Sequence, residues 1–211
     1  MHDKFKGSKF RKLPKEFYIR SSVIVAKELI GKYLFRNTGK EILSGIIVET
    51  EAYTGRTDPA AHSYNGKTPR NEVMFEEGGA AYVYFTYGNH FCFNTVTGKK
   101  NTPSAVLIRG IEPLEGIETM KKNRGTNDLY NLTNGPGKLT KAFSIDKKLN
   151  GASLRGDEIY ISEAVGNNKK YIVMRSKRIG ITKNPDKLYR FFAKDNWFVT
   201  KTPKKLLVKA Q

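Results

Sequence analysis

Residues 41–53 have the sequence Glu-Ile-Leu-Ser-Gly-Ile-Ile-Val-Glu-Thr-Glu-Ala-Tyr, which is rich in isoleucine and valine and predicts a β-strand. Because side chains alternate between the two faces of a strand, Glu49, Glu51 and Tyr53 share one face. Two carboxylates on one face can act as an acid/base pair, or can divide between catalysis and an ion pair with Arg or Lys. The alternative is that both carboxylates face solvent on an edge strand.

Working outward from this strand, turn residues and hydrophobic periodicity predict a mixture of helices and strands. A helix capped by Ser21 or Ser22 is expected to end at Gly31. Two further helices and several strands follow. The helices are predicted over residues 113–122 and 136–143, and the strands over residues 32–36, 104–110, 158–162, 170–175 and 197–199. The pattern indicates one α+β domain whose strands are mostly antiparallel.

Lysine and arginine total 38 against 20 acidic residues, which gives a formal net charge of +18. An excess of this size favours a polyanionic partner, because cationic side chains release counterions from a phosphate backbone. Charge alone does not distinguish DNA from RNA or an anionic membrane, and a solvated basic surface is the plain alternative. We expect basic tails at residues 1–15 and 201–211, flanking a domain over residues 16–200.

Cysteine and histidine are too few to predict a metal site. Cys92 is the only cysteine, so no intrachain disulfide can form and an intracellular compartment is expected. Its apolar neighbours favour a buried structural thiol over a nucleophile. No helical histidine pair is present, and His62 lies in the long loop of residues 54–77. The chain has no apolar run of about 18 or more residues, so no membrane span is expected.

Residues 80–96 hold two aromatic-rich runs around Gly88-Asn89 and predict a protruding β-hairpin. Alternate aromatic residues on a strand usually pack in a core. The other interpretation is that Tyr53, Tyr84 and Tyr87 form a stacking surface for an unstacked base, with Tyr87 placed to enter the base stack.

A second feature that suits an anionic partner is Gly135-Pro136-Gly137-Lys138, which precedes a predicted helix. A helix N-terminus with a lysine beside it can hold a phosphate, so Lys138 is a candidate phosphate ligand. The spacing does not match a nucleotide-binding loop.

Several short segments in a fixed order resemble one family, the alkyladenine (3-methyladenine) DNA glycosylases without a helix-hairpin-helix. Between about Arg20 and Val199 these segments cover nearly the whole chain. They are Val48–Tyr53, Ala60–Ser63, Thr68–Asn71, Met74–Phe75, Tyr82–Tyr84, Tyr87–Gly88, Phe91–Cys92, Val106–Arg109, Glu112–Gly116 and Asn134–Leu139.

The resemblance implies a single mixed domain around a curved, mostly antiparallel sheet. It places Glu51, rather than Glu49, at the position of the general base that activates a water. Arg109 falls where an arginine holds that water and the carboxylate.

The remaining site residues implied by the resemblance bind the base or the duplex. Tyr53, His62 and Tyr84 fall where a flipped base is sandwiched, and the His62 backbone N–H meets its 6-position. Asn94 falls where an asparagine opposes the 2-amino group of guanine. Tyr87 falls where a tyrosine enters through the minor groove.

The resemblance therefore implies a DNA repair enzyme that flips alkylated or deaminated purines from double-stranded DNA and hydrolyses their N-glycosidic bond. We expect no metal, no cofactor and no covalent lysine intermediate. We also expect a monomer, located in the cytoplasm of a bacterium or the nucleus of a eukaryote. The sequence departs locally from the family pattern at residues 86–90, around the tyrosine expected to enter the minor groove, and at residues 97–104. These departures concern the contacts of that tyrosine and the preference among damaged bases. A non-enzymatic nucleic-acid-binding module and an RNA-modifying enzyme are the alternatives.

Overall fold

The computed structural model describes residues 9–86, 88–166, 170–201 and 208–210, and all strands of this part belong to one antiparallel sheet. The strand order is β1-β7-β2-β3-β6-β5-β4, and β9, β8 and β10 continue from β3 as a side branch. The strands are β1 (Lys9–Lys12), β2 (Tyr33–Asn37), β3 (Ile42–Tyr53), β4 (Ala81–Thr86), β5 (His90–Thr97), β6 (Ser104–Glu115), β7 (Ile159–Val165), β8 (Val173–Ser176), β9 (Arg190–Ala193) and β10 (Val208–Lys209). The helices are α1 (Lys15–Tyr18), α2 (Ser22–Leu29), α3 (Ile117–Arg124) and α4 (Pro136–Ala142). The predicted α+β class with antiparallel strands is confirmed.

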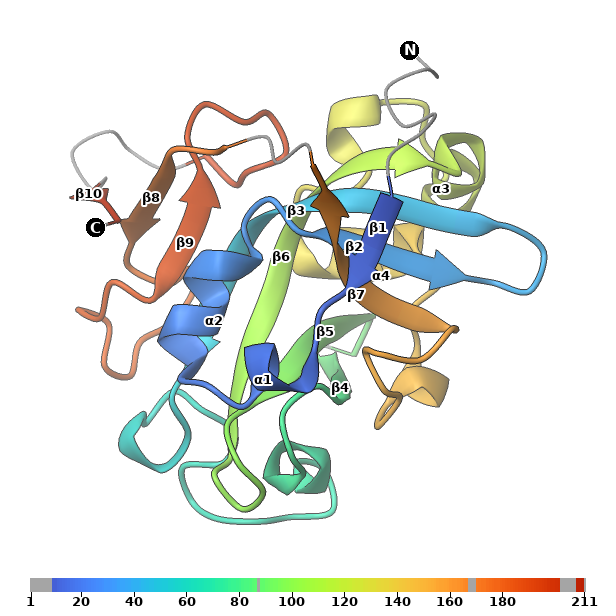
Figure 1. The fold of residues 1–211 in the computed structure, drawn as a ribbon. Helices are drawn as coiled ribbons and strands as arrows, with labels where there is room; N and C mark the ends of the chain where they lie inside the picture. Colours follow the sequence, from blue (N-terminus) through green and yellow to red (C-terminus); the bar gives the residue numbers. More distant parts are fainter. Residues whose placement is uncertain (1–8, 87, 167–169, 202–207, 211) are drawn as a thin grey trace.

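Strand β3 is the centre of this sheet because three strands pair with it. One edge pairs with β6 along most of its length, and the other edge is shared by β2 in the first half and β9 in the second. Register shifts beside Gly45 and Glu49 interrupt the β3–β6 ladder, and such bulges bend a strand. Figure 1 shows the result: β8 and β9 lie apart from β1, β2 and β7, with β3 and β6 between them.

Helix α2 covers one face of β3. The Ser21 side chain accepts from the backbone N–H of Val23 at the start of the helix, and Gly31 has a φ of 89° just beyond its end, as the sequence predicts. Thr50 donates a hydrogen bond of 2.8 Å to the carbonyl of Ala26, so Thr50 faces the helix. The alternate residues Glu49 and Glu51 consequently face away from α2.

The aromatic segment forms the predicted hairpin. Strands β4 and β5 pair so that Tyr82 lies opposite Asn94 and Tyr84 opposite Cys92. Phe93 is fully buried in the core, whereas the Phe85 side chain is half exposed. Tyr87 lies outside the described residues.

In the second half, the helix predicted over residues 113–122 forms only from residue 117, and the strand predicted over residues 197–199 is wrong. Residues 113–115 belong to β6, and α3 begins only after Gly116, whose φ of 73° ends the strand. Residues 197–199 form no strand, and Trp197 is 77% exposed. The last strand of this region is instead β9, whose four residues are all buried.

The expected tails contain strands among their described residues. Strand β1, within the expected basic tail, pairs with β7, and Leu13 is buried because it follows β1 into the core. At the other end, β10 lies inside the expected tail 201–211 and pairs with β8. Among the described residues no helix is both long and apolar enough to cross a bilayer.

Candidate active site

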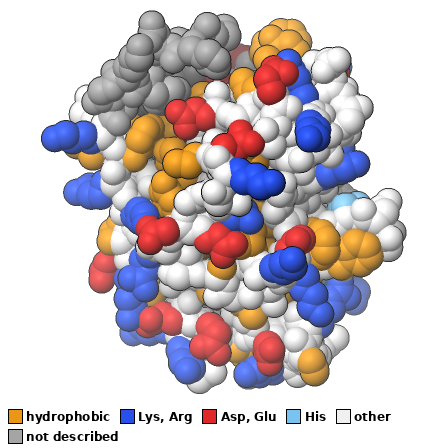
Figure 2. All heavy atoms as spheres, turned by 90° about the vertical axis from the view of Figure 1, so that its right-hand side faces the viewer, with side chains coloured by type: hydrophobic (Ala, Val, Ile, Leu, Met, Phe, Trp, Pro, Cys, Tyr) orange, Lys and Arg blue, Asp and Glu red, His pale blue; other side chains and the backbone are white. Residues whose placement is uncertain are grey.

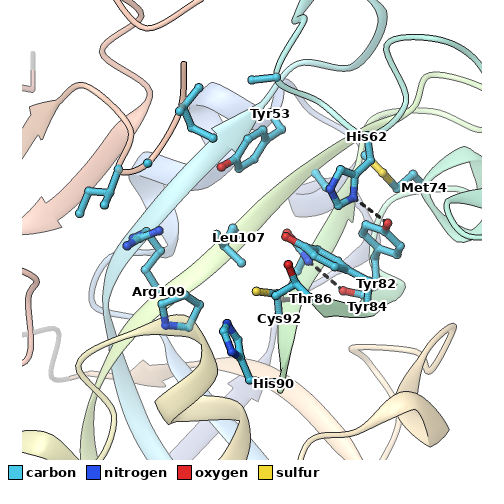
Figure 3. Close-up of a pocket in the computed structure, with 17 residues that line it drawn as sticks. Tyr53, His62, Met74, Tyr82, Tyr84, Thr86, His90, Cys92, Leu107 and Arg109 are labelled. Carbon is cyan, nitrogen blue, oxygen red and sulfur yellow. Dashed lines mark hydrogen bonds between the residues drawn. The ribbon is translucent and has the colours of Figure 1, made fainter. Parts of the chain in front are cut away.

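A cavity of about 200 Å³ lies where the ends of several elements meet: β3, the loop 54–77, the β4–β5 hairpin, β6, the start of α4 and the β8–β9 connection (Figure 3). Small and apolar side chains from β5 and β6 form part of its lining. The lining residues are Tyr53, Ala60, His62, Met74, Tyr82, Tyr84, Thr86, His90, Cys92, Asn94, Ala105, Leu107, Arg109, Pro136, Ile179, Gly180 and Ile181.

Glu51 lies behind this lining and is fully buried. Its Oε2 accepts a hydrogen bond of 2.9 Å from the Tyr53 hydroxyl, and its Oε1 accepts one of 2.8 Å from the backbone N–H of Ile179. Both donors line the cavity. The alternative of an edge strand is wrong, since β6 and β9 flank β3 at this point.

Arg109 reaches both carboxylates from the neighbouring strand β6. Its Nη1 lies 3.4 Å from Oε2 of Glu51, and its Nε donates to Oε1 of Glu49 at 3.1 Å. Burial alone would lower the pKa of Arg109, but Glu51 and Glu49 outweigh that effect and raise the pKa above its usual value. The guanidinium is therefore a permanent cation at the cavity wall.

Glu49 serves a different purpose from Glu51. Its Oε1 accepts from Arg109 and, at 2.7 Å, from Nε of Arg190, while its Oε2 accepts from the N–H and the hydroxyl of Thr200. Glu49 does not line the cavity. The sequence interpretation that one glutamate of the pair takes part in ion pairs is confirmed.

Aromatic side chains face one another across the cavity. Tyr53 lies on one side, and His62, Tyr82 and Tyr84 lie on the other, with Leu107 between them (Figure 3). The His62 and Tyr84 rings meet edge to face, with centroids 4.5 Å apart. Nδ1 of His62 lies 2.9 Å from the Tyr82 hydroxyl, which fixes the ring.

The titratable rings that line the cavity are held neutral. Burial, followed by nearby Arg70, lowers the pKa of His62, although this residue is partly exposed to solvent. Burial, followed by Glu51, raises the pKa of Tyr53 well above its usual value. Burial, followed by Cys92, likewise raises the pKa of Tyr84 above its usual value. Uncharged rings suit a planar, largely apolar ligand.

Cys92 and Asn94 lie on β5 at the base of the cavity. Both are buried, and Nδ2 of Asn94 donates to the Tyr82 carbonyl at 3.0 Å. Burial raises the pKa of the Cys92 thiol. Cys92 is thus a buried, protonated thiol, as its sequence context predicts.

Lys138 lies beside the cavity rather than in its lining. It is in the first turn of α4, two residues after the lining residue Pro136. Its Nζ donates to the side-chain oxygens of Asn131 and Asn134, and burial with nearby Arg124 lowers its pKa. The structure brings the other described site residues together around the cavity, and Tyr87 lies outside the described residues.

Residues 178–181 are a part of the site that the sequence reasoning missed. Ile179, Gly180 and Ile181 line the cavity, and Arg178 forms a buried ion pair with Asp58 of the loop 54–77. A lone Arg-Ile-Gly-Ile carries no recognisable signal, because its partners lie more than a hundred residues earlier. Within the described ranges, no three histidine, cysteine or acidic side chains are arranged to hold a metal ion.

A buried carboxylate beside an aromatic cavity, in a cationic α+β domain, is an arrangement suited to a hydrolase that acts on an extruded nucleobase. The sequence profile of the methylpurine-DNA glycosylase (MPG) family matches residues 16–197, and the chain belongs to this family. It is therefore a DNA glycosylase of DNA repair, a hydrolase of N-glycosidic bonds whose substrate is DNA.

Individual relatives agree with this assignment over nearly their whole length. The chain is 50% identical to a protein of Carboxydothermus hydrogenoformans over 190 residues, which are 90% of this chain and 98% of the relative. It is 47% identical to one of Natranaerobius thermophilus, again over 90% of this chain and 98% of the relative. Both are named "Putative 3-methyladenine DNA glycosylase".

Proposed function

We propose that this DNA glycosylase flips alkylated or deaminated purines out of duplex DNA and hydrolyses their N-glycosidic bond with a water that Glu51 activates. The observation that carries the proposal is the fully buried Glu51 carboxylate, held by two residues that line an aromatic cavity. A carboxylate in this position is shielded from bulk water but lies one side chain away from a bound ligand.

The cavity supplies the binding step. The extruded purine lies between Tyr53 on one side and His62 with Tyr84 on the other, where each stacking contact contributes about 1–3 kcal/mol. The backbone N–H of His62 meets the 6-position of the base. Asn94, whose amide is oriented by the Tyr82 carbonyl, opposes the 2-amino group of guanine.

Glu51 supplies the chemical step. As the bond from C1′ to the base nitrogen breaks, its electron pair leaves with the base and positive charge develops on the sugar. The water oxygen bonds to C1′, and a water proton passes to the Glu51 carboxylate. Arg109 lies 3.4 Å from that carboxylate, so it helps to hold the carboxylate and the water.

Selectivity arises from the flipping cost and from the cavity. Damaged or mispaired bases cost less to extrude than paired ones. An amide donor at the 6-position rejects adenine, because two donors cannot pair. Cationic alkylated purines leave easily, whereas neutral lesions are protonated as they leave.

Two residues outside the lining contact the duplex in this proposal. Tyr87 enters the minor groove and fills the space that the flipped base leaves. Lys138 binds a phosphate beside the start of α4, since its ammonium bonds to two amide oxygens and keeps a third proton. The protein acts as a cytoplasmic monomer without a lyase step.

The test is base release from a duplex with a single hypoxanthine or 3-methyladenine. Wild type releases the base, whereas Glu51→Gln binds the duplex but is slower by about 10²–10⁴-fold, as expected for loss of a general base. Glu163→Gln, which removes a carboxylate on β7, is the control and keeps the wild-type rate. A Glu51→Gln variant with wild-type activity would overturn the proposal.

Further arms separate the alternatives. A binding module releases no base from either duplex, and an RNA-modifying enzyme prefers a matched RNA substrate. Borohydride trapping tests the absence of a lyase step, because a trapped enzyme–DNA adduct would show a covalent lysine intermediate.

A further inference from the structure

Arg178 lies where three separate segments of the site meet, in the connection between β8 and β9. Its side chain is 1% exposed, and its fork binds Asp58 through Nη1 to Oδ2 at 2.5 Å and Nη2 to Oδ1 at 2.9 Å. Asp58 also accepts from the backbone N–H of Thr54 and of Ala60, so the ion pair fixes the loop that carries the lining residue Ala60.

The same guanidinium also fixes the end of β3. Nη1 donates to the Ala52 carbonyl at 3.0 Å, and the guanidinium carbon lies 4.6 Å from the centroid of the Tyr53 ring. Tyr53 is the residue whose hydroxyl donates to Glu51. Arg178 thus contacts both the strand and the ring that orient one oxygen of the carboxylate.

The other carboxylate oxygen is tied to Arg178 through the chain itself. Ile179 follows Arg178 directly, and its backbone N–H donates to Oε1 of Glu51 across 128 positions of sequence. Because the Arg178 side chain is bound to Asp58, the backbone of Arg178 and the adjoining amide of Ile179 are restrained in position. Both oxygens of Glu51 therefore depend on where Arg178 is held.

We propose that Arg178, held by Asp58, is a positioning residue for the reaction assigned above to Glu51: it fixes the Ile179 amide and the Tyr53 ring on the two carboxylate oxygens. The inference rests on the proposed function of Glu51. Arg178 touches neither the base nor the water in this account and acts only through Tyr53 and Ile179.

A role in stability alone does not explain the arrangement. A buried ion pair contributes little net stability, because removing both charges from water offsets their attraction. In addition, Nε of Arg178 is buried without a hydrogen-bond partner among the described residues, which is costly. The guanidinium instead lies over the Tyr53 ring and so restrains the orientation of that ring.

Loss of this positioning separates the chemical step from binding. A carboxylate displaced from the attacking water slows bond cleavage, whereas the rings of the cavity still hold the base. A role in stability alone would lower the melting temperature without changing the rate of the folded enzyme.

The experiment measures duplex affinity and single-turnover base release from a hypoxanthine duplex for Arg178→Lys and Asp58→Asn. Lysine keeps the charge but cannot form the two-pronged contact, and asparagine keeps the shape of Asp58 without its charge. Arg36→Lys is the matched control, since Arg36 is also largely covered but lies on β2 and bonds to the Asn37 and Glu158 carbonyls.

We expect both site variants to bind the duplex normally and to release base about 10- to 100-fold more slowly per active enzyme, as for a misplaced catalytic group. The control keeps the wild-type affinity and rate. Rates are normalised to the active fraction, so partial unfolding does not imitate the effect.

Two results would overturn the inference: an unchanged rate per active enzyme in both variants, whatever their melting temperature, or a slower rate that weaker binding of the duplex fully explains. Glu51→Gln distinguishes this from failure of the proposed function. If Glu51→Gln is inactive and the Arg178 and Asp58 variants behave as wild type, only the positioning role fails. If Glu51→Gln is fully active, the catalytic role of Glu51 fails first.

Discussion

Glu49 and Glu51 are identical side chains on one strand face, yet their surroundings differ. Glu49 accepts four hydrogen bonds, from Arg109, Arg190 and Thr200, and has no contact with the cavity. Glu51 accepts from two residues that line the cavity and lies 3.4 Å from one nitrogen of Arg109. The difference lies in their partners, which strand alternation alone does not specify.

Glu49→Gln is therefore expected to reduce stability. The change leaves two buried arginines without a full counter-charge, and breaking a buried pair from one side costs about 3–5 kcal/mol. Urea unfolding monitored by circular dichroism measures the loss. Glu118→Gln, which breaks an exposed pair with Lys121, should cost no more than about 1 kcal/mol. Equal stability of Glu49→Gln and wild type would contradict the ion-pair role.

His62 makes the stability of the protein depend on pH. Its pKa is lowered from 6.5 in the folded state, so protonation favours the unfolded chain. The contribution of neutral His62 to stability is complete above pH 6.5 and declines as the pH falls from there through the folded pKa.

The comparison of wild type with His62→Gln isolates this effect, because the other titratable groups are common to both. The difference in unfolding free energy between them should shift against wild type on going from about pH 8 to about pH 5. A difference that does not vary with pH, or that shifts in favour of wild type on acidification, would show that the His62 pKa is not lowered.

At the scale of elements, the site depends on how the loop 54–77 is fastened to the sheet. Gly55 begins this loop with a φ of 71°, and a Cβ there would lie 2.0 Å from the Pro103 carbonyl oxygen. Ser63, further along the loop, donates to the same carbonyl. Asp58, which holds Arg178, lies between these two attachments.

Gly55→Ala should consequently destabilise the protein by at least about 2 kcal/mol, because the new methyl group meets backbone and the left-handed conformation adds strain. Gly39→Ala is the matched control. Gly39 has a φ of 81° with nothing within 4 Å of its would-be Cβ, so only the strain of about 1 kcal/mol remains. Thermal unfolding of both variants makes the comparison, and equal losses would contradict the close contact at Pro103.

The elements predicted correctly from sequence are those with a local signal. Residues 41–53 are rich in isoleucine and valine and form a long strand whose side chains alternate in direction, Ser21 and Gly31 bound α2, and Gly88-Asn89 separates the two strands of the hairpin. The alternation also places Glu51 and Tyr53 on one face, which their hydrogen bond confirms.

The missed elements depend on distant partners. β9 begins with Arg190, which reads as a surface residue until its partner Glu49, 141 positions earlier, is known. β1 has one apolar residue, Phe10, and becomes a strand only by pairing with β7. Likewise, Arg178 belongs to the site only because Asp58 is folded against it.

At the scale of the whole molecule, one face of the protein carries both signs of charge. On the face shown in Figure 2, acidic side chains lie among the lysines and arginines, so this face offers no continuous cationic surface. The net charge of +18 nevertheless favours association with DNA, through contacts at phosphates rather than bases.

The affinity for undamaged duplex should therefore fall linearly with salt on logarithmic axes, with a slope of about −0.9 for each phosphate contact. Lys138→Gln should weaken binding to all sequences alike and make the slope shallower by about 1. Lys40→Gln is the control, since Lys40 precedes β3 at the end opposite Glu51. Fluorescence anisotropy measures both slopes, and an unchanged slope for Lys138→Gln would remove this residue from the phosphate contacts.

The most direct measurement is a crystal structure of Glu51→Gln bound to a duplex that contains one hypoxanthine. The account predicts an extruded base between Tyr53 and the rings of His62 and Tyr84, with C1′ of its sugar directed toward residue 51. A hypoxanthine that remains stacked in the duplex, or one that is extruded elsewhere than this cavity, would contradict the assignment of Glu51 as the residue that activates the water.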